Sequence, residues 1–325
     1  MSRIFDALQR SEGDRKGNES IALPQGQELI REAERRATSD WEAAVSLDEP
    51  KSQAVAEMEE IFSQPKTPSP ASGAPNSLAS TGLVEGEWNA MLKRFQSRPV
   101  SISPESRLVC LEDWTSPTAE AMRLLAVRLR DLRRSRTLKK VVITSTVPRE
   151  GKSTIASNLS CALARRAKEK VLLIEGDLRL PAITKMFGID QQFGLCEFMR
   201  GERDLADCVY HLADAGIWVL PAGKAMGNPL EVLQSQSLPV LLDQLSAMFD
   251  WVVIDSPPVL PLADTSIWMR LADGVLLVTR QGVTEKKQLQ KGLEFLEPQK
   301  LVGALLNGAQ ASNYGSYYYA QSKLT

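Results

Sequence analysis

One stretch of this chain, from Val141 to Ala164, constrains the fold more strongly than any other; it reads VVITSTVPREGKSTIASNLSCALA. It begins with a short run of apolar, β-branched residues, which predicts a buried strand. A break at Pro148 follows, and then the letters GKST, after which apolar residues recur at helical spacing. Strand, loop, GK[ST] and helix is the order of a phosphate-binding loop, in which backbone N–H groups and a helix N-terminus face an anion. We therefore expect a nucleotide phosphate site in this stretch.

The expected loop departs from the usual pattern at its first position. The pattern has a glycine five residues before Gly151, and this chain has Thr146 there. A chance GKST on a polar helix cap is the alternative, but the strand before it and the helix after it favour the loop. We expect Lys152 to reach the β- and γ-phosphates and the Ser153 hydroxyl to ligate Mg²⁺. The other residues assigned to the nucleotide site from this loop are Pro148, Arg149, Glu150, Gly151 and Thr154.

Further apolar runs alternate with helical patterns after the loop, which indicates an α/β fold of three layers with a mainly parallel sheet. In such sheets, ligands bind at the carboxyl ends of the strands. Glu175, Asp177, Asp255 and Asn307 all lie at or just past expected strand ends, so we expect them to meet the loop. The expected strands after the first are 171–177, 217–223, 251–258, 274–280 and 301–309, and the expected helices include 238–248 and 285–296.

The carboxylates at these strand ends suit a metal-nucleotide site. Mg²⁺ prefers hard oxygen ligands, often one or two carboxylates. Asp255 follows four apolar residues and has the Walker B form, with a capping or loop aspartate as the alternative. Glu175 and Asp177 alternate on their strand, so one is expected to bind a metal-ligated water and the other to accept a proton from an attacking hydroxyl. A purely structural Glu175 is the alternative.

The chain divides into three parts by composition. Residues 1–103 are rich in Pro, Ser, Gly and polar residues and are expected to be mostly disordered with transient helices. An ordered domain is expected over 104–310, opening with a strand or extended arm at 108–114. The tail, 311–325, is expected to be mobile. Four of the five tyrosines lie in it, and we interpret them as phosphoacceptors, with packing against the domain as the alternative: Tyr314, Tyr317, Tyr318 and Tyr319.

Composition also argues against several classes of protein. The net charge of −1 disfavours a general nucleic-acid binder, although basic residues gather over 123–140, as a solvated helix face or a contact with an acidic partner. The four cysteines have neither metal-ligand spacing nor a disulfide framework, which fits a reducing cytosol. No run approaches the roughly 18 apolar residues of a membrane span, and the N-terminus does not resemble a signal peptide. We therefore expect a cytoplasmic protein that reaches a membrane only through a partner.

These features together resemble the cytoplasmic bacterial tyrosine kinases (BY-kinases) of exopolysaccharide and capsule assembly. That family belongs to the P-loop branch that includes the MinD- and ParA-like septum-site and partitioning ATPases. The resemblance covers about 116–309 and the tail, and its most specific motifs are TSTVPREGKST, LLIEGDLRLP and WVVIDSPPVLPLAD.

The resemblance implies the roles of individual residues. It implies ATP and Mg²⁺ as cofactors, with phosphate and metal binding by Lys152, Ser153 and Thr154. It also implies that Asp177 and Asp255 serve the metal. Glu175 lies where the family typically has Asp and is the candidate base for the tyrosine hydroxyl, and Arg179 matches the family's arginine after the acidic pair.

The resemblance also implies partners. A separate membrane-bound polysaccharide chain-length regulator would activate the kinase through its cytoplasmic segment and recruit it to the inner face of the plasma membrane. The family often forms rings through a Glu-x-x-Arg-x-x-Arg motif. Glu120 and Arg123 match this motif, and the third position is Ala126, which departs from it; the resemblance still implies a homo-oligomer.

Two other functions remain open at this point. The first is a partitioning-type ATPase switch, which usually carries an additional lysine near the start of the loop, where this chain has Thr146, Val147 and Pro148. The second is a scaffold that binds nucleotide and gates polysaccharide export without phosphorylating tyrosine.

Overall fold

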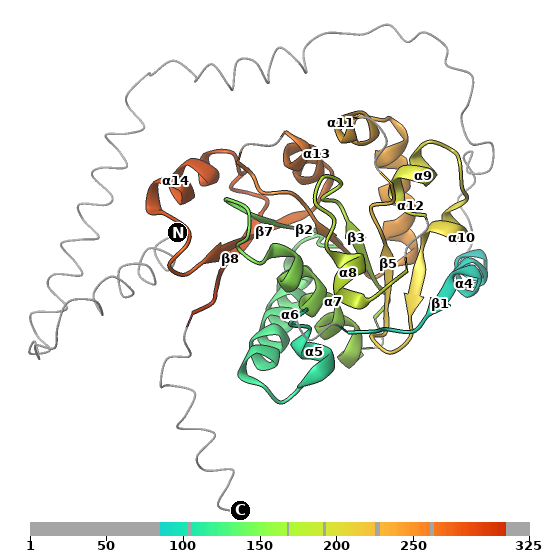
Figure 1. Cartoon of the computed structure of the whole chain (residues 1–325), viewed down its shortest axis with the longest axis horizontal. Coiled ribbons are helices and arrows are strands. Elements are labelled where there is room, and N and C mark those ends of the chain that lie inside the picture. Colours follow the sequence, from blue (N-terminus) through green and yellow to red (C-terminus); the bar gives the residue numbers. More distant parts are fainter. Residues whose placement is uncertain are drawn as a thin grey trace, which may run out of the picture. The chain divides into compact units, whose positions relative to one another are not determined.

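The computed structural model describes residues 85–102, 106–167, 169–190, 193–224, 228–260 and 263–309 (Figure 1). Within these ranges the strands form one sheet in the order β1-β4-β5-β3-β6-β2-β7-β8. All neighbouring strands run parallel except β4 and β5, which are antiparallel. The strands are β1 (Gln96–Arg98), β2 (Lys140–Ser145), β3 (Val171–Glu175), β4 (Tyr210–Leu212), β5 (Ile217–Leu220), β6 (Trp251–Asp255), β7 (Gly274–Arg280) and β8 (Leu301–Asn307).

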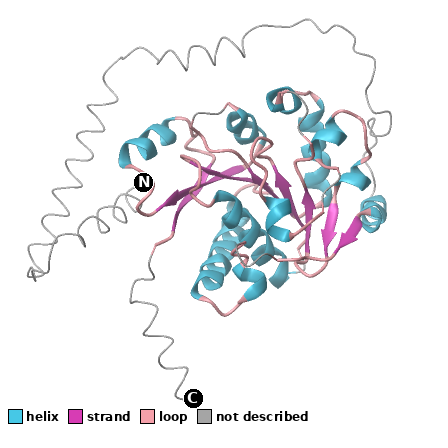
Figure 2. Ribbon diagram, in the orientation of Figure 1, coloured by secondary structure: helices cyan, strands magenta, loops and turns pink. Residues whose placement is uncertain are grey.

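Helices cover both faces of this sheet, so the expected three-layer α/β fold with a mainly parallel sheet is confirmed (Figure 2). The six expected strands correspond to β2, β3, β5, β6, β7 and β8. The helices are α4 (Glu85–Arg94), α5 (Val109–Glu112), α6 (Pro117–Ser135), α7 (Lys152–Ala167), α8 (Ile183–Phe187), α9 (Leu195–Met199), α10 (Leu205–Cys208), α11 (Pro229–Leu233), α12 (Ser237–Met248), α13 (Asp264–Leu271) and α14 (Lys286–Glu294).

The start of the folded domain differs from the expectation. α4 and β1 precede residue 104, and β1 pairs with β4, with Gln96 opposite Tyr210. Phe95 between them stacks on Phe249, with 6.5 Å between the ring centroids. The domain therefore begins before the expected boundary. The expected arm at 108–114 instead contains the short helix α5, while residues 1–84 and the tail from 310 lie outside the described residues.

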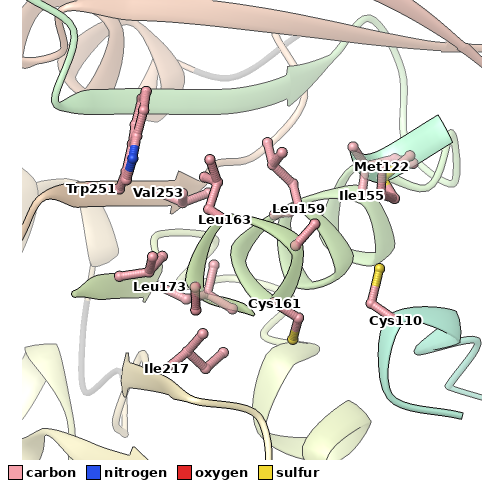
Figure 3. Close-up of a cluster of buried hydrophobic side chains, with 14 of the residues drawn as sticks. Cys110, Met122, Ile155, Leu159, Cys161, Leu163, Leu173, Ile217, Trp251 and Val253 are labelled. Carbon is pink, nitrogen blue, oxygen red and sulfur yellow. The ribbon is translucent and has the colours of Figure 1, made fainter. Parts of the chain in front are cut away.

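The main core lies between α7 and the sheet (Figure 3). β2, β3 and β6 are almost wholly buried and are rich in Val, Ile and Leu, as is typical of a strand covered on both faces. Ile155, Leu159 and Leu163 recur at helical spacing on α7 and are buried in this core. This packing fixes the first turn of α7 against the carboxyl ends of the central strands, which is where a phosphate site is expected.

α6 packs beside α7 and explains much of the basic stretch. Its N-cap is Ser116, whose hydroxyl accepts a hydrogen bond from the Ala119 N–H at 3.2 Å. Arg130 donates to Glu169 at 2.8 Å and to the Leu163 carbonyl at 2.7 Å, so this arginine fastens α6 to its neighbours and is not merely solvated. Ala126 is buried in the core, so an arginine at this ring-motif position would require repacking.

Candidate active site

Three neighbouring strands end at the candidate site. β6 lies between β3 and β2, and Asp255 pairs with Glu175 on one side and with Ile143 on the other. The loop that follows β2 leads directly into α7, whose first residue is Lys152. Because parallel strands end at the same edge of a sheet, the fold brings Lys152, Glu175 and Asp255 together as the sequence predicted.

The loop between β2 and α7 has an unusual backbone. Arg149 has φ 67° and Gly151 has φ 93°, both in the left-handed region that favours glycine. A Cβ at Gly151 would also collide with the Asn307 side chain. Asn307 donates from Nδ2 to the Glu150 carbonyl at 2.9 Å, so its side chain is hydrogen-bonded to the loop. A role for Asn307 in binding nucleotide stays a prediction.

A second glycine accommodates Thr146, the residue that replaces the first glycine of the usual loop. Thr146 is fully buried, and its methyl group lies beneath Gly292 of α14. A Cβ at Gly292 would come within 2.8 Å of the Thr146 Cγ2 atom. The Thr146 side chain therefore occupies the space that a side chain at position 292 would need. Sequence reasoning missed this compensation because the two residues are far apart in the chain.

Lys152 lies among carboxyl groups. Its Nζ is 2.9 Å from Asp177 Oδ2, and its side chain is only 14% exposed. Burial acts to lower the pKa of Lys152, but the neighbouring Asp255, Asp177 and Glu175 outweigh it and raise the pKa. Lys152 therefore stays protonated at the loop, as a lysine that binds phosphate must.

Asp255 is the site's least satisfied group. It is fully buried, and neither carboxyl oxygen accepts a hydrogen bond of ordinary geometry from any described residue. Desolvation raises the pKa of Asp255 from its ordinary 3.8 to about 7, against the opposing effects of the Lys152 charge and the Ser153 hydroxyl. A buried carboxyl with free lone pairs suits a cation or its water shell.

The donor set fits Mg²⁺. This ion commonly keeps several waters and takes one or two carboxylates, with phosphate oxygens completing its shell. Asp255, Asp177 and Ser153 supply such donors at the end of the loop. Among the described residues, no group of three or more His, Cys, Asp and Glu side chains is arranged as an all-protein metal site. Ser153 with Asp255, Asp177 or both would hold a metal that arrives with nucleotide.

The loop after β3 is tied to α13. Arg179 donates from Nε to Asp264 Oδ2 at 2.7 Å and from Nη2 to Oδ1 at 3.2 Å. Nearby, the Gly176 N–H donates to the Asp255 carbonyl at 2.7 Å, and Trp268 Nε1 donates to the Gly176 carbonyl at 3.1 Å. Arg179 was predicted to contact nucleotide; in this structure it pairs with Asp264, and its nucleotide role stays a prediction.

Comparison with known proteins shows the family. A family model described as an AAA domain matches residues 139–297. The tyrosine-protein kinase YwqD of Bacillus subtilis (strain 168) is 34% identical over 221 residues, which cover 67% of this chain and 93% of that protein. This chain belongs to the bacterial tyrosine-protein kinases.

Some relatives are longer than this chain. The tyrosine-protein kinase ptk of Acinetobacter johnsonii is 37% identical over 177 residues, which cover 54% of this chain but only 24% of that protein. Among solved structures, the kinase domain of Escherichia coli tyrosine kinase ETK matches with a TM-score of 0.58 and 28% identity, over 64% of this chain and 84% of that one.

No helix in the described ranges has the length and apolar character needed to cross a membrane.

Backbone N–H groups engage both carboxyl oxygens of Glu175, the candidate base. It is fully buried, and it accepts hydrogen bonds from the Ile183 N–H at 2.5 Å and the Ala222 N–H at 3.0 Å. Burial raises its pKa, and the backbone N–H groups oppose that shift. A tyrosine hydroxyl would have to share these oxygens with the backbone, and the role of Glu175 as the base stays a prediction. The geometry therefore favours the structural alternative, in which Glu175 joins β3 to the start of α8 and to the residues after β5.

We expect Glu175→Gln to destabilise the fold. The carboxamide has one acceptor oxygen where the carboxyl group has two, so a backbone N–H would face an NH₂ group. Leaving a buried donor unpaired costs about 1–3 kcal/mol, and chemical denaturation measures this loss. Unchanged stability together with a loss of phosphate transfer greater than about a hundredfold would instead identify Glu175 as the base.

Proposed function

We propose that this kinase transfers the γ-phosphate of ATP to the tyrosines of its own tail, Tyr314, Tyr317, Tyr318 and Tyr319. The observation that carries the proposal is the constellation of Lys152 with Asp177 and Asp255, in which Asp255 accepts no hydrogen bond of ordinary geometry from the described residues. Family membership supports tyrosine as the acceptor. The tail lies outside the described residues, so its place here rests on its sequence.

The proposed chemistry asks for positioning more than for covalent catalysis. Mg²⁺, when bound, would neutralise charge on the β- and γ-phosphates. Ser153 and Asp255 would hold the ion, and Lys152 would hold the phosphate oxygens. The tyrosine oxygen forms a bond to the γ-phosphorus while the bond from that phosphorus to the β–γ bridging oxygen breaks, and ADP leaves.

The hydroxyl proton needs an acceptor at the same edge of the sheet. We assign this role to Asp177, because its carboxyl group contacts Lys152 directly, whereas the described hydrogen bonds to both Glu175 oxygens come only from backbone N–H groups. Asp177 contacts Lys152 through one oxygen and the Leu180 N–H, at 3.1 Å, through the other. Its carboxyl group is therefore oriented at the lysine that is expected to bind the transferred phosphate.

We propose further that the kinase acts in exopolysaccharide or capsule assembly, at the inner face of the plasma membrane, with the cytoplasmic segment of a membrane-bound chain-length regulator. Family membership and the sequence motifs support this setting. A homo-oligomer remains part of the proposal, although Ala126 interrupts the ring motif.

The test replaces all four tail tyrosines with phenylalanine. Incubation of the full chain with Mg-ATP, with and without the candidate partner segment, should add phosphate to the wild type and not to the variant, as intact mass would show. Equal phosphate on both proteins would show that a residue other than these tyrosines accepts the phosphate. ATP turnover without phosphate on either would favour the ATPase switch, and nucleotide binding without turnover would favour the scaffold.

A further inference from the structure

Glu150 belongs to the loop motif, but its side chain turns inward. It is fully buried, and Val147 donates its N–H to Glu150 Oε2 at 2.8 Å. The other oxygen, Oε1, accepts a hydrogen bond from the Thr284 hydroxyl, in the loop that follows β7. The Thr284 oxygen in turn accepts the Arg280 N–H at 2.8 Å. The Glu150 carboxyl group therefore joins the phosphate-binding loop to the end of β7.

Two further contacts reach the loop from the ends of β7 and β8. Asn307 donates to the Glu150 carbonyl at 2.9 Å, and Arg280 Nη1 donates to the Arg149 carbonyl at 3.1 Å. Arg280, Thr284 and Asn307 therefore all contact the loop at Arg149 or Glu150. These contacts hold the part of the loop where Arg149 has a left-handed backbone. A strained backbone persists only where its surroundings determine it.

We infer that Glu150 and Thr284 are positioning residues for nucleotide binding, which hold the loop in its phosphate-binding conformation through the bond between their side chains. Without that bond, the loop would spend part of its time in other conformations. A ligand's apparent affinity falls in proportion to the fraction of protein that is competent to bind it. The inference rests on the proposed function only in assuming that the loop binds nucleotide.

The chemistry of Glu150 allows a rescue test. Glu150→Ala removes both acceptors and leaves the Val147 N–H unpaired. Glu150→Gln keeps one oxygen for Val147 and offers its NH₂ group to the Thr284 oxygen, so it can rebuild both contacts. Thr284→Val removes the hydroxyl with almost no change in shape.

Two matched controls separate positioning from general stability. Glu197 is also a buried glutamate that accepts two loop N–H groups, those of Gly194 at 2.8 Å and Lys224 at 2.9 Å, and it does not touch the phosphate-binding loop. Thr279 is a buried threonine on β7 whose hydroxyl donates to the Leu305 carbonyl at 3.3 Å. Glu197→Ala and Thr279→Val therefore reproduce the local losses at side chains whose described hydrogen bonds do not involve the phosphate-binding loop.

The experiment titrates Mg-ADP into the full chain by calorimetry and records the melting temperature of each variant. Glu150→Ala should weaken binding about tenfold and Thr284→Val about fivefold, as expected if the competent fraction falls to roughly a tenth and a fifth. Glu150→Gln should stay within about threefold of the wild type, and both controls should bind normally even where they melt earlier.

Normal Mg-ADP binding by Thr284→Val would overturn the inference, and this variant decides the question if Glu150→Ala does not fold. Equal weakening by Glu197→Ala would also overturn it, because the loss would then follow stability and not the loop. Binding of Mg-ADP requires no phosphate transfer. The measured Mg-ADP affinities can therefore be interpreted even if the proposed tyrosine phosphorylation is not observed.

Discussion

Asp255→Asn should raise the melting temperature of the nucleotide-free protein at pH 8 and strongly slow phosphate transfer. The carboxyl group is buried without hydrogen-bond partners of ordinary geometry among the described residues, and burial raises its pKa from 3.8 to about 7. At pH 8 the group is ionised, and the folded protein bears the cost of that buried charge. An asparagine of the same shape carries no charge, so the fold should gain on the order of 2 kcal/mol, or about 4–8 °C.

The pH dependence follows from the sign of the shift. Because the pKa is raised in the folded state, the native protein holds a proton that the unfolded chain releases at lower pH. The contribution of this proton to the free energy of unfolding is fully present below about pH 4 and is lost as the pH rises through about 7. The advantage of Asp255→Asn should therefore shrink at pH 5.5, where the wild-type carboxyl group is mostly protonated. Scanning calorimetry in EDTA at the two pH values measures both effects.

The same substitution should cost roughly a hundred- to a thousandfold in phosphate transfer, because the metal loses a charged ligand. A gain in stability with a loss of chemistry is expected where a residue is retained for function against the preference of the fold. Lower stability of Asp255→Asn at pH 8 would contradict this account, since it would mean that the ionised carboxylate has stabilising partners in the nucleotide-free protein.

Lys152→Met should have the opposite effect on stability. Lys152 is the cation beside Asp177, Asp255 and Glu175, so its removal leaves buried carboxyl groups uncompensated. Breaking a buried pair in this way costs about 3–5 kcal/mol at pH 8, and less at lower pH, where the carboxyl groups can protonate. Phosphate transfer should be lost as well, because Lys152 is expected to hold the phosphates.

Lys140→Met is the matched control for this prediction. Lys140 is 16% exposed, close to the 14% of Lys152, and its partner Asp243, at 2.8 Å, is mostly exposed. Such a pair contributes about 0–1 kcal/mol. Denaturation should also show that adding Asp255→Asn to Lys152→Met restores part of the lost stability. Equal stabilities of Lys152→Met and Lys140→Met would contradict the prediction. Asp255→Asn is therefore the better inactive control for kinase assays.

Much of the fold could be predicted from the sequence because its central strands are long apolar runs. β2, β3 and β6 are buried on both faces, and burial of that kind leaves an unmistakable run of Val, Ile and Leu. The edge strand β1 and its neighbour β4 have only three residues each, too few to show a period, so they were missed. The local pattern also indicates where each strand ends. It therefore predicted that Lys152 and Asp255 lie close together at one edge of the sheet.

The direction of individual side chains could not be predicted in the same way. Glu175 and Asp177 have the spacing of two residues on one side of a strand, but the Glu175 carboxyl group turns to N–H donors 8 and 47 residues away. Glu150 was assigned to the nucleotide site because it lies in the loop motif, yet its side chain binds Thr284, 134 residues away. Such contacts depend on the assembled fold, and no short-range pattern records them.

The central claim, that the site transfers phosphate to the tail, is tested most directly by mapping phosphopeptides of the full chain after incubation with Mg-ATP and the partner segment. Asp255→Asn, which is expected to be at least as stable as the wild type at pH 8, serves as the inactive control. The account predicts phosphate on one or more of Tyr314, Tyr317, Tyr318 and Tyr319 in the wild type and at least about a hundredfold slower phosphorylation in the variant. An unmodified wild-type tail despite measured Mg-ATP binding would contradict it, and so would equal phosphate on the tails of both proteins.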